Sequence, residues 1–357
     1  MVILVTILCI LFISYSLVFF NFKVDKKPDH VISEFLPVSI IIAGKNEGHN
    51  LNGLFQSLER LNYPPSYFEI IFVDDSSADN TFNIAKKLSL NFTNMKVYKV
   101  NNKKYEGKRG ALQFGIDKSK YGIILITDAD CRPEPEWINA FVNLFGKGYD
   151  FLFGISPFVQ KNGFVNRLAC FENLWTHILT FSFASIGLPY SAASRSFGFN
   201  KKSFLSVGGY SETTDTISGD DDLLLREAIK AKLKIGTVTA KDSFVFTFAK
   251  SKVKEYFFQK VRHTKTSNYY LLKHKILLGA WHLLNTIFLL SPVLMFISVY
   301  SGILFILKFL IDIIIVKSRM KLLKYKFKII EIVFYQSVYD LLIILVFISG
   351  PFTKNRW

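Results

Sequence analysis

The chain has 357 residues, and its 44 Lys and Arg outnumber its 28 Asp and Glu, which gives a formal net charge of +16. Half of the residues are apolar and 16% are aromatic, which excludes a disordered chain and a collagen-like repeat. The three cysteines, Cys9, Cys131 and Cys170, are too few and too scattered for a disulfide framework or a zinc site.

Residues 1–22 form an apolar segment without a charged side chain. As a helix these 22 residues would span about 33 Å, and a bilayer core is about 30 Å thick. The segment lacks the basic start and the small-residue cleavage site of a signal peptide. We therefore expect an uncleaved N-terminal transmembrane anchor, followed by a linker over residues 23–36.

Residues 37–127 alternate between short apolar runs and helical patterns. Strands are predicted over 37–43, 68–73, 95–100 and 121–127, and helices over 51–61, 81–88 and 110–118. Asn50 is expected to cap the first of these helices. The βαβαβαβ order predicts an α/β fold, a doubly wound and mostly parallel sheet with helices on both faces.

Polar residues follow the predicted strands, at Asn46-Glu47, Asp74-Asp75 and Asp128-Ala129-Asp130. In doubly wound sheets, ligands bind beyond the carboxyl ends of the strands. A G-x-G-x-x-G turn and a G-x-x-x-x-G-K-[ST] loop are both absent from the sequence, which disfavours a dinucleotide oxidoreductase and a P-loop nucleotidase. Carboxylates at strand ends instead suit a diphosphate that is bridged by a hard divalent cation.

Four segments in this order resemble the membrane-anchored members of glycosyltransferase family 2. They are Gly44-Lys45-Asn46-Glu47, VDDSSAD at 73–79, GKRGALQ at 107–113 and the D-x-D element Asp128-Ala129-Asp130. The resemblance implies a catalytic domain of GT-A type over residues 37–250. It also implies that Asp128 and Asp130 bind Mn²⁺ or Mg²⁺.

The same resemblance suggests which residues bind the nucleotide-sugar donor and which residue is the catalytic base. It assigns donor binding to Ala43, Asn46, Glu47, Asp74, Asp75, Lys108, Asp128, Gln259 and Arg262. Residues 219–226, GDDDLLLR, are similar to the family's E-D-x-D-L-x-L-R, which makes Asp220 the base; a slipped register selects Asp221. An alternative role for this acidic cluster is to cap the helix that begins near Leu223.

The sequence Gln259-Lys260-Val261-Arg262-His263 resembles the family's Q-x-x-R-W, with His263 in place of Trp. In processive members the Trp stacks on the terminal sugar, so the smaller imidazole disfavours long-chain synthesis. Arg262 would either bridge the diphosphate or meet anionic lipid. Residues 251–275 are basic and aromatic, which favours an interfacial helix at the membrane over a nucleic-acid site.

Residues 276–350 are predicted to form a C-terminal transmembrane region, with spans at about 276–298, 301–316 and 329–349 and a tail over 351–357. Pro292 would lie inside the first of these helices. The loop 317–328 has six basic residues and no acid, so it is expected in the cytoplasm. Counting back through two spans places residues 23–275 in the cytoplasm as well.

Together these features predict an inverting glycosyltransferase of a bacterial inner membrane, with its catalytic domain in the cytoplasm. It would move a sugar from a nucleotide-diphosphate donor, a UDP-sugar, to a lipid-linked or glycan acceptor. One alternative is a processive polysaccharide synthase that extrudes its product, for which four spans would require an oligomer. Another is a catalytically silent membrane scaffold that keeps the fold.

Overall fold

A computed structural model describes residues 2–25, 35–216, 218–296 and 300–350. The chain divides into two compact units, each with its own internal contacts. We call residues 24–157 and 190–248 the α/β unit. We call residues 1–23, 158–189 and 249–350 the helical unit. Residues 158–189, which lie inside the predicted catalytic domain, are therefore part of the helical unit.

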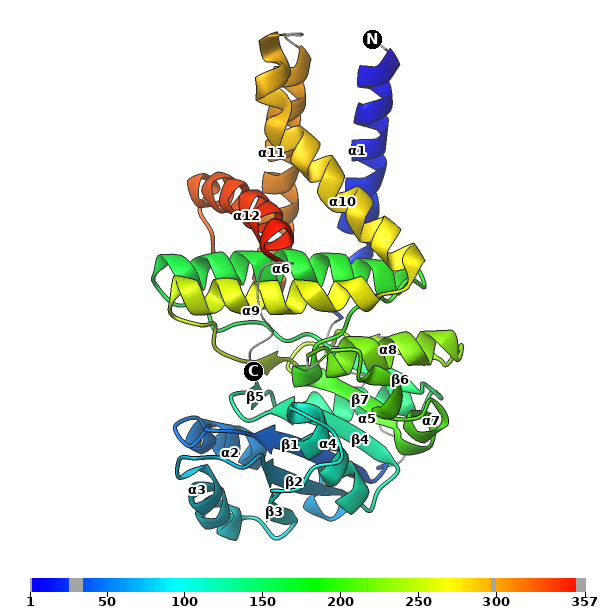
Figure 1. Ribbon diagram of the computed structural model, residues 1–357, viewed down its shortest axis with the longest axis vertical. Helices are drawn as coiled ribbons and strands as arrows, with labels where there is room; N and C mark the ends of the chain where they lie inside the picture. Colours follow the sequence, from blue (N-terminus) through cyan, green and yellow to red (C-terminus); the bar gives the residue numbers. More distant parts are fainter. Residues whose placement is uncertain (1, 26–34, 217, 297–299, 351–357) are drawn as a thin grey trace. The chain divides into compact units, whose positions relative to one another are not determined.

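The α/β unit is built on a seven-stranded sheet with the order β3-β2-β1-β4-β7-β6-β8 (Figure 1). Its strands are β1 (Val38–Gly44), β2 (Phe68–Asp74), β3 (Met95–Lys99), β4 (Ile123–Asp128), β6 (Phe151–Gly154), β7 (Phe197–Asn200) and β8 (Ile235–Val238). Only β7 runs antiparallel to its neighbours β4 and β6. This mixed, mostly parallel sheet with helices confirms the predicted α/β class.

Helices on both faces of the sheet explain why its central strands are continuous apolar runs. Every residue of β1 and β2 is buried. On one face, Ile40 and Ile42 belong to a core that includes residues of α2 (Leu51–Glu59) and α5 (Trp137–Phe145). On the other face, Gly115 of α4 (Lys108–Lys118) packs so closely on Ile41 that an added Cβ would lie 2.5 Å from its Cγ2.

The register of the central strands aligns their carboxyl ends. Gly44 of β1 pairs with Asp74 of β2, and Ala43 of β1 pairs with Asp128 of β4. Three of the predicted polar clusters therefore begin at one edge of the sheet. Helix α8 (Asp220–Lys230) begins within the segment 219–226, and α3 (Thr81–Leu88) begins just after the segment 73–79.

The helix predicted at 51–61 is present, but the prediction that Asn50 caps it is wrong. The Asn50 side chain makes no hydrogen bond to the first turn of α2. Its Nδ2 instead donates to Oε2 of Glu47, at 2.7 Å. The side chain is thus used by the Asn-Glu turn that precedes the helix.

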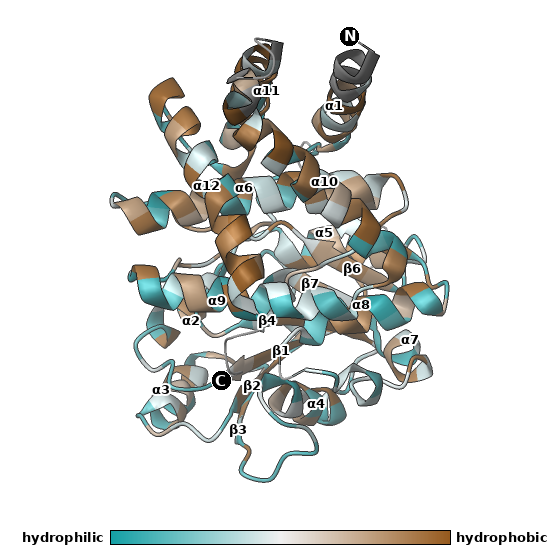
Figure 2. Cartoon of the chain, turned by 45° about the horizontal axis from the view of Figure 1, so that its top comes forward, coloured by the Kyte–Doolittle hydropathy of each residue, from teal (hydrophilic) through white to brown (hydrophobic). Residues whose placement is uncertain are grey.

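Among the described residues, the helical unit contains six long helices. They are α1 (Val2–Asn21), α6 (Phe164–Ser185), α9 (Val253–Thr266), α10 (Leu272–Leu290), α11 (Tyr300–Arg319) and α12 (Ile329–Ser349). Among the described residues, two stretches are long and apolar enough to cross a membrane, Leu272–Val293 and Ile329–Ser349. A shorter apolar helix covers Ile10–Asn21. The apolar residues of α10 and α12 are visible in Figure 2.

The sequence suggested that Pro292 lies inside a helix that spans 276–298, and the structure differs on this point. Helix α10 ends at Leu290, and a 3-10 segment, η6 (Ser291–Phe296), follows it. The missing N–H of proline and its clash with the preceding turn account for this early end. Lys308 and Asp312 form an ion pair within α11 at 2.8 Å, and Lys308 also contacts Asp340 of α12 at 2.5 Å.

Candidate active site

Two aspartates stand where β2 ends, and both are almost completely buried. Asp74 is the last residue of the strand, and Asp75 follows it. Oδ2 of Asp74 accepts a hydrogen bond from the backbone N–H of Ser77 at 3.3 Å, whereas its Oδ1 has no partner among the described residues. Asp75 forms an ion pair with Lys103 at 2.6 Å. An unpartnered buried carboxylate oxygen is costly, so Asp74 Oδ1 is suited to accept a donor group from a ligand.

The Asn46-Glu47 turn is joined by hydrogen bonds to the segment that follows these aspartates. The N–H of Asn46 donates to Oγ of Ser77 at 2.9 Å, and Oδ1 of Asn46 accepts from the N–H of Ala78 at 2.8 Å. The N–H of Glu47 donates to Oγ1 of Thr81 at 2.8 Å. The first two motifs of the sequence thus form one connected surface, beside Ala43.

Lys108, the first residue of α4, lies at the centre of a polar cluster that also contains Asp128, Ser194 and Asp220. Its ammonium group contacts the carboxylate of Asp128 and donates to Oγ of Ser194 at 2.8 Å. Its Nζ also lies 3.9 Å from Oδ2 of Asp220. Burial alone would lower the pKa of Lys108, but the charges of Asp128 and Asp220 outweigh it and raise this pKa above its ordinary value. Lys108 is therefore a fixed positive charge between two carboxylates.

The three adjacent aspartates at the start of α8 have different surroundings. Oδ2 of Asp221 accepts the N–H of Ser194 at 2.6 Å, and Oδ1 of Asp222 accepts the N–H of Ala192 at 3.0 Å and the hydroxyl of Ser191 at 2.8 Å. Burial, together with the charges of Asp222 and Asp220, raises the pKa of Asp221 well above its usual range. Asp221 and Asp222 thus hold residues 191–194, whereas Asp220 faces Lys108.

Asp128 and Asp130 meet the requirements of a hard divalent cation. One ligand atom from each of Asp128, Asp130 and Cys131 lies within 4.8 Å of the other two. Burial, and then the charges of Asp130 and Asp128, raise the pKa of Cys131 well above its ordinary value. Its thiol stays protonated and donates to Oδ1 of Asp130 at 3.4 Å. The two carboxylates therefore fit Mn²⁺ or Mg²⁺, and the thiol does not.

Gln259 and Arg262, the two donor-binding residues predicted from the Q-x-x-R motif, lie on α9 of the helical unit. Lys260, between them, forms an ion pair with Glu172 of α6 at 2.5 Å. Tyr256 also donates to Glu172, at 3.3 Å. These contacts fix the orientation of α9 on α6 within the helical unit.

The other predicted site residues all belong to the α/β unit, which brings Lys108, Asp128 and Asp220 together around one ammonium group. Sequence reasoning missed two further residues, Lys103 and Ser194. Lys103 had a weak signal, because it lies in a basic loop just before the GKRGALQ segment. Ser194 had none, since its segment matches no motif.

Comparison with known families identifies two matches. A model described as "Glycosyl transferase family group 2" matches residues 123–323, more than half of the 357 residues. A model described as "Glycosyl transferase family 2" matches residues 39–202. The two matches overlap between residues 123 and 202, and together they include every predicted site residue.

Curated relatives match over shorter stretches. Glycosyltransferase AglE of Haloferax volcanii is 31% identical over 127 residues, which are 35% of this chain and 41% of the relative. Beta-monoglucosyldiacylglycerol synthase of Trichormus variabilis is 32% identical over 123 residues, which are 33% of this chain and 26% of the relative. The chain thus spans less than half the length of these relatives.

One solved structure resembles the chain along nearly its whole length. This is the mannosyltransferase PcManGT from Pyrobaculum calidifontis, in complex with GDP-Man and Mn²⁺. The TM-score is 0.60, with 14% identity and 99% of both chains covered. At this identity the similarity shows a shared fold.

Proposed function

The chain belongs to glycosyltransferase family 2, and from this premise we propose that it transfers a sugar from a UDP-sugar to a hydroxyl of a lipid-linked or glycan acceptor at a membrane. The observation that carries the proposal is the cluster of Lys108, Asp128 and Asp220. In this cluster a cation and two carboxylates meet at an edge of an α/β sheet where ligands bind.

Asp220 is the catalytic base of this proposal. Its carboxylate takes the proton of the acceptor hydroxyl while the hydroxyl oxygen attacks the anomeric carbon. The new C–O bond forms as the bond from that carbon to the diphosphate oxygen breaks, and the nucleoside diphosphate leaves with the electron pair. In-line attack inverts the anomeric configuration. A positioned base of this kind contributes about 10²–10⁴-fold to the rate.

The contacts of the neighbouring carboxylates favour Asp220 over Asp221 as the base. Asp221 and Asp222 accept hydrogen bonds from residues 191–194, which reduces their ability to accept a proton from a substrate. The raised pKa of Asp221 also opposes its ionisation. The Asp220 side chain is 15% exposed, and its Oδ2 lies 3.9 Å from Nζ of Lys108, so it points into the same cluster as Asp128.

Asp128 and Asp130 would hold the divalent cation, which when bound supplies positive charge against the diphosphate of the donor. Lys108 provides a second cation in the same place. Its raised pKa keeps it charged at physiological pH, so it favours an anionic leaving group. PcManGT, which shares the fold, is described with Mn²⁺.

The nucleoside of the donor would lie along the connected surface at the ends of β1 and β2. Ala43, Asn46, Glu47, Asp74 and Asp75 are the residues that we assign to it. The buried carboxylates of Asp74 and Asp75 suit the N–H and hydroxyl groups of a base and a ribose.

The apolar helices support a membrane location. We propose that 1–22, 276–298, 301–316 and 329–349 span a bacterial inner membrane, that 251–275 lie at its surface, and that the α/β unit is cytoplasmic. Two described helices have the required length and apolarity. The match to a diacylglycerol-modifying relative supports a lipid-linked acceptor.

The experiment is a transfer assay with membranes from an expressing host, Mn²⁺ and a panel of labelled UDP-sugars and GDP-sugars. We expect labelled product from the wild type, and a loss of about 10²-fold or more in Asp128→Ala and in Asp220→Asn. Asp117→Asn is the matched control, because Asp117 is an exposed acid of α4. Transfer by neither wild type nor control would contradict the function, whereas full activity in both site variants would contradict the residue assignment.

A further inference from the structure

The segment that leads into α8 is held by two arginines from different helices. This segment, residues 211–216 with 218–219, begins with the 3-10 turn η4 (Ser211–Thr213) and ends at Gly219. Gly219 has a φ of 80°, a left-handed conformation that favours glycine, and Asp220 follows it directly. We call the segment the base loop, because its last residue is bonded to the proposed catalytic base.

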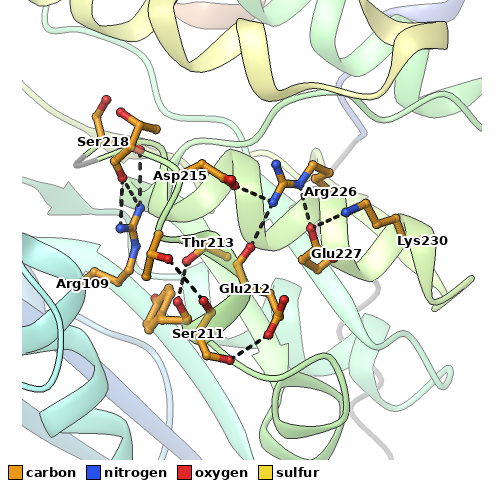
Figure 3. Close-up of polar contacts among 12 residues, drawn as sticks. Arg109, Ser211, Glu212, Thr213, Asp215, Ser218, Arg226, Glu227 and Lys230 are labelled. Atoms are coloured by element: carbon orange, nitrogen blue, oxygen red, sulfur yellow. Dashed lines mark hydrogen bonds and ion pairs between the residues drawn. The ribbon is translucent and has the colours of Figure 1, made fainter.

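Arg109 binds the end of the base loop that is closest to Asp220. Its Nη1 and Nη2 donate to the carbonyl oxygen of Thr216 at 3.0 and 3.1 Å, and Nη2 also donates to that of Ser218 at 3.4 Å (Figure 3). The residue is only 3% exposed, and among the described residues no carboxylate lies within ion-pair distance of it. Burying a cation against carbonyl groups alone is unfavourable, which makes Arg109 an expensive choice for packing.

Arg226 of α8 binds the other end of the base loop. Its Nη2 donates to the carbonyl oxygen of Glu212 at 2.9 Å and to Oδ2 of Asp215 at 2.8 Å. Its Nε donates to Oε1 of Glu227 at 2.7 Å, and Lys230 contacts the same carboxylate (Figure 3). Arg226 is therefore balanced by two acids, as is usual for a structural ion-pair network.

The position of Arg109 in the sequence connects the two halves of the site. Arg109 directly follows Lys108, so one turn of α4 provides both the contact to Asp128 and the contact to the base loop. Arg109 also binds the carbonyl oxygen of Ser218, and only Gly219 lies between Ser218 and Asp220 in the chain. A displacement of Arg109 would therefore move Asp220 relative to Lys108 and Asp128.

We propose that Arg109 is a positioning residue for Asp220. Through the base loop it sets the distance from Asp220 to Lys108 and Asp128. The inference rests on the proposed function and adds to it a residue that touches neither substrate. Because an error of about 1 Å in a catalytic group can cost about 10²-fold in rate, the effect of such a residue is measurable.

The test is a double-mutant cycle between Arg109→Lys and Asp220→Asn, read as kcat for transfer and KM for the donor. Lysine keeps the charge but cannot reach both carbonyls with a planar fork. We expect Arg109→Lys to lower kcat about 10- to 100-fold with the donor KM changed by less than about twofold. In the Asp220→Asn background, the same substitution should cost less than about twofold, because the base that it positions is already absent.

Arg226→Lys is the matched control, because Arg226 is a half-buried arginine of α8 that binds the same loop at its other end, through Glu212 and Asp215. Its effect on kcat should be the same in both backgrounds. An equal cost of Arg109→Lys in both backgrounds would overturn the inference, while an inactive wild type would contradict the proposed function instead.

Should Arg109→Lys lower the unfolding temperature, Arg109→Gln is used in its place, with hydrogen exchange measured at the amides of 218–224. Faster exchange there than at 211–215 supports the inference, and equal exchange contradicts it.

Discussion

The ammonium group of Lys108 bonds to the carboxylate of Asp128, so the start of α4 is joined to the end of β4. The two residues come from separate motifs, GKRGALQ and the D-x-D element. Parallel pairing places the end of β4 next to that of β1, and α4 packs on β1 and β2. The contact between Lys108 and Asp128 thus follows from the topology of the sheet, and it draws Asp220 and Ser194 to the same point.

Replacing Lys108 with Met should abolish this arrangement. The variant removes a cation that lies against both Asp128 and Asp220, so the repulsion between their charges would be less compensated. We expect the rate of transfer to fall about 10²-fold or more, as for other charge-stabilising groups in active sites. Steady-state kinetics of the membrane enzyme measure this loss.

Lys104→Met is the control for the change of charge, because Lys104 is an exposed residue of the preceding loop. Its activity should stay within about twofold of the wild type. Because the pKa of Lys108 is raised, its ammonium stays charged over the whole range in which the enzyme would work. If the wild type lost activity as the pH rose towards 9 and Lys108→Met did not, Lys108 would be losing its charge in that range, which would contradict this interpretation.

The strands and helices between residues 37 and 128 could be predicted to within about two residues, because buried parallel strands appear as uninterrupted apolar runs and the helices between them as amphipathic patterns. The place of β7 in the sheet could not, since an antiparallel strand between β4 and β6 depends on contacts far apart in the chain. The same holds for the site. Lys108 and Asp128 belong to motifs, whereas Ser194 is brought to them by Asp221, through a backbone hydrogen bond that no sequence pattern encodes.

A methyl group at position 110 should disturb the loop before α4. A Cβ on Gly110 would lie 2.1 Å from the carbonyl oxygen of Tyr105 and 2.8 Å from Cβ of Lys103, so residues 103–105 would have to move. Because Lys103 pairs with Asp75, we expect Gly110→Ala to raise the KM for the donor several-fold and to destabilise the protein by about 1–3 kcal/mol. Gly122→Ala is the control, since no atom lies within 4 Å of its added Cβ. Equal donor KM in the two variants would show that the loop does not contact the nucleotide.

Cys131 and Cys170 should resist alkylation in the folded protein. Both are buried, and burial raises the pKa of Cys170 to about 12 and that of Cys131 well above its ordinary value. A raised pKa keeps the thiol protonated at pH 8, and the thiolate is the reactive form. Mass spectrometry after treatment with iodoacetamide at pH 8 should find both unmodified until a denaturant is added. Modification of Cys131 under native conditions would mean that the region of Asp128 and Asp130 opens in solution.

The buried charges of the helical unit should be interdependent. Lys308 and Asp312 are completely buried on α11, and Lys308 also contacts Asp340 of α12, whose Oδ1 accepts from Gln336 at 3.0 Å. Removing one partner of a buried ionic group leaves the others uncompensated, at a cost of about 3–5 kcal/mol. We therefore expect Lys308→Met to lower the unfolding temperature in detergent strongly. Lys321→Met should leave it unchanged, because Lys321 is an exposed residue of the following turn.

Adding Asp312→Asn and Asp340→Asn to Lys308→Met should restore most of the stability, because an apolar and neutral set carries no unpaired charge. A triple variant no more stable than Lys308→Met would mean that Lys308 contributes through packing and not through its charge.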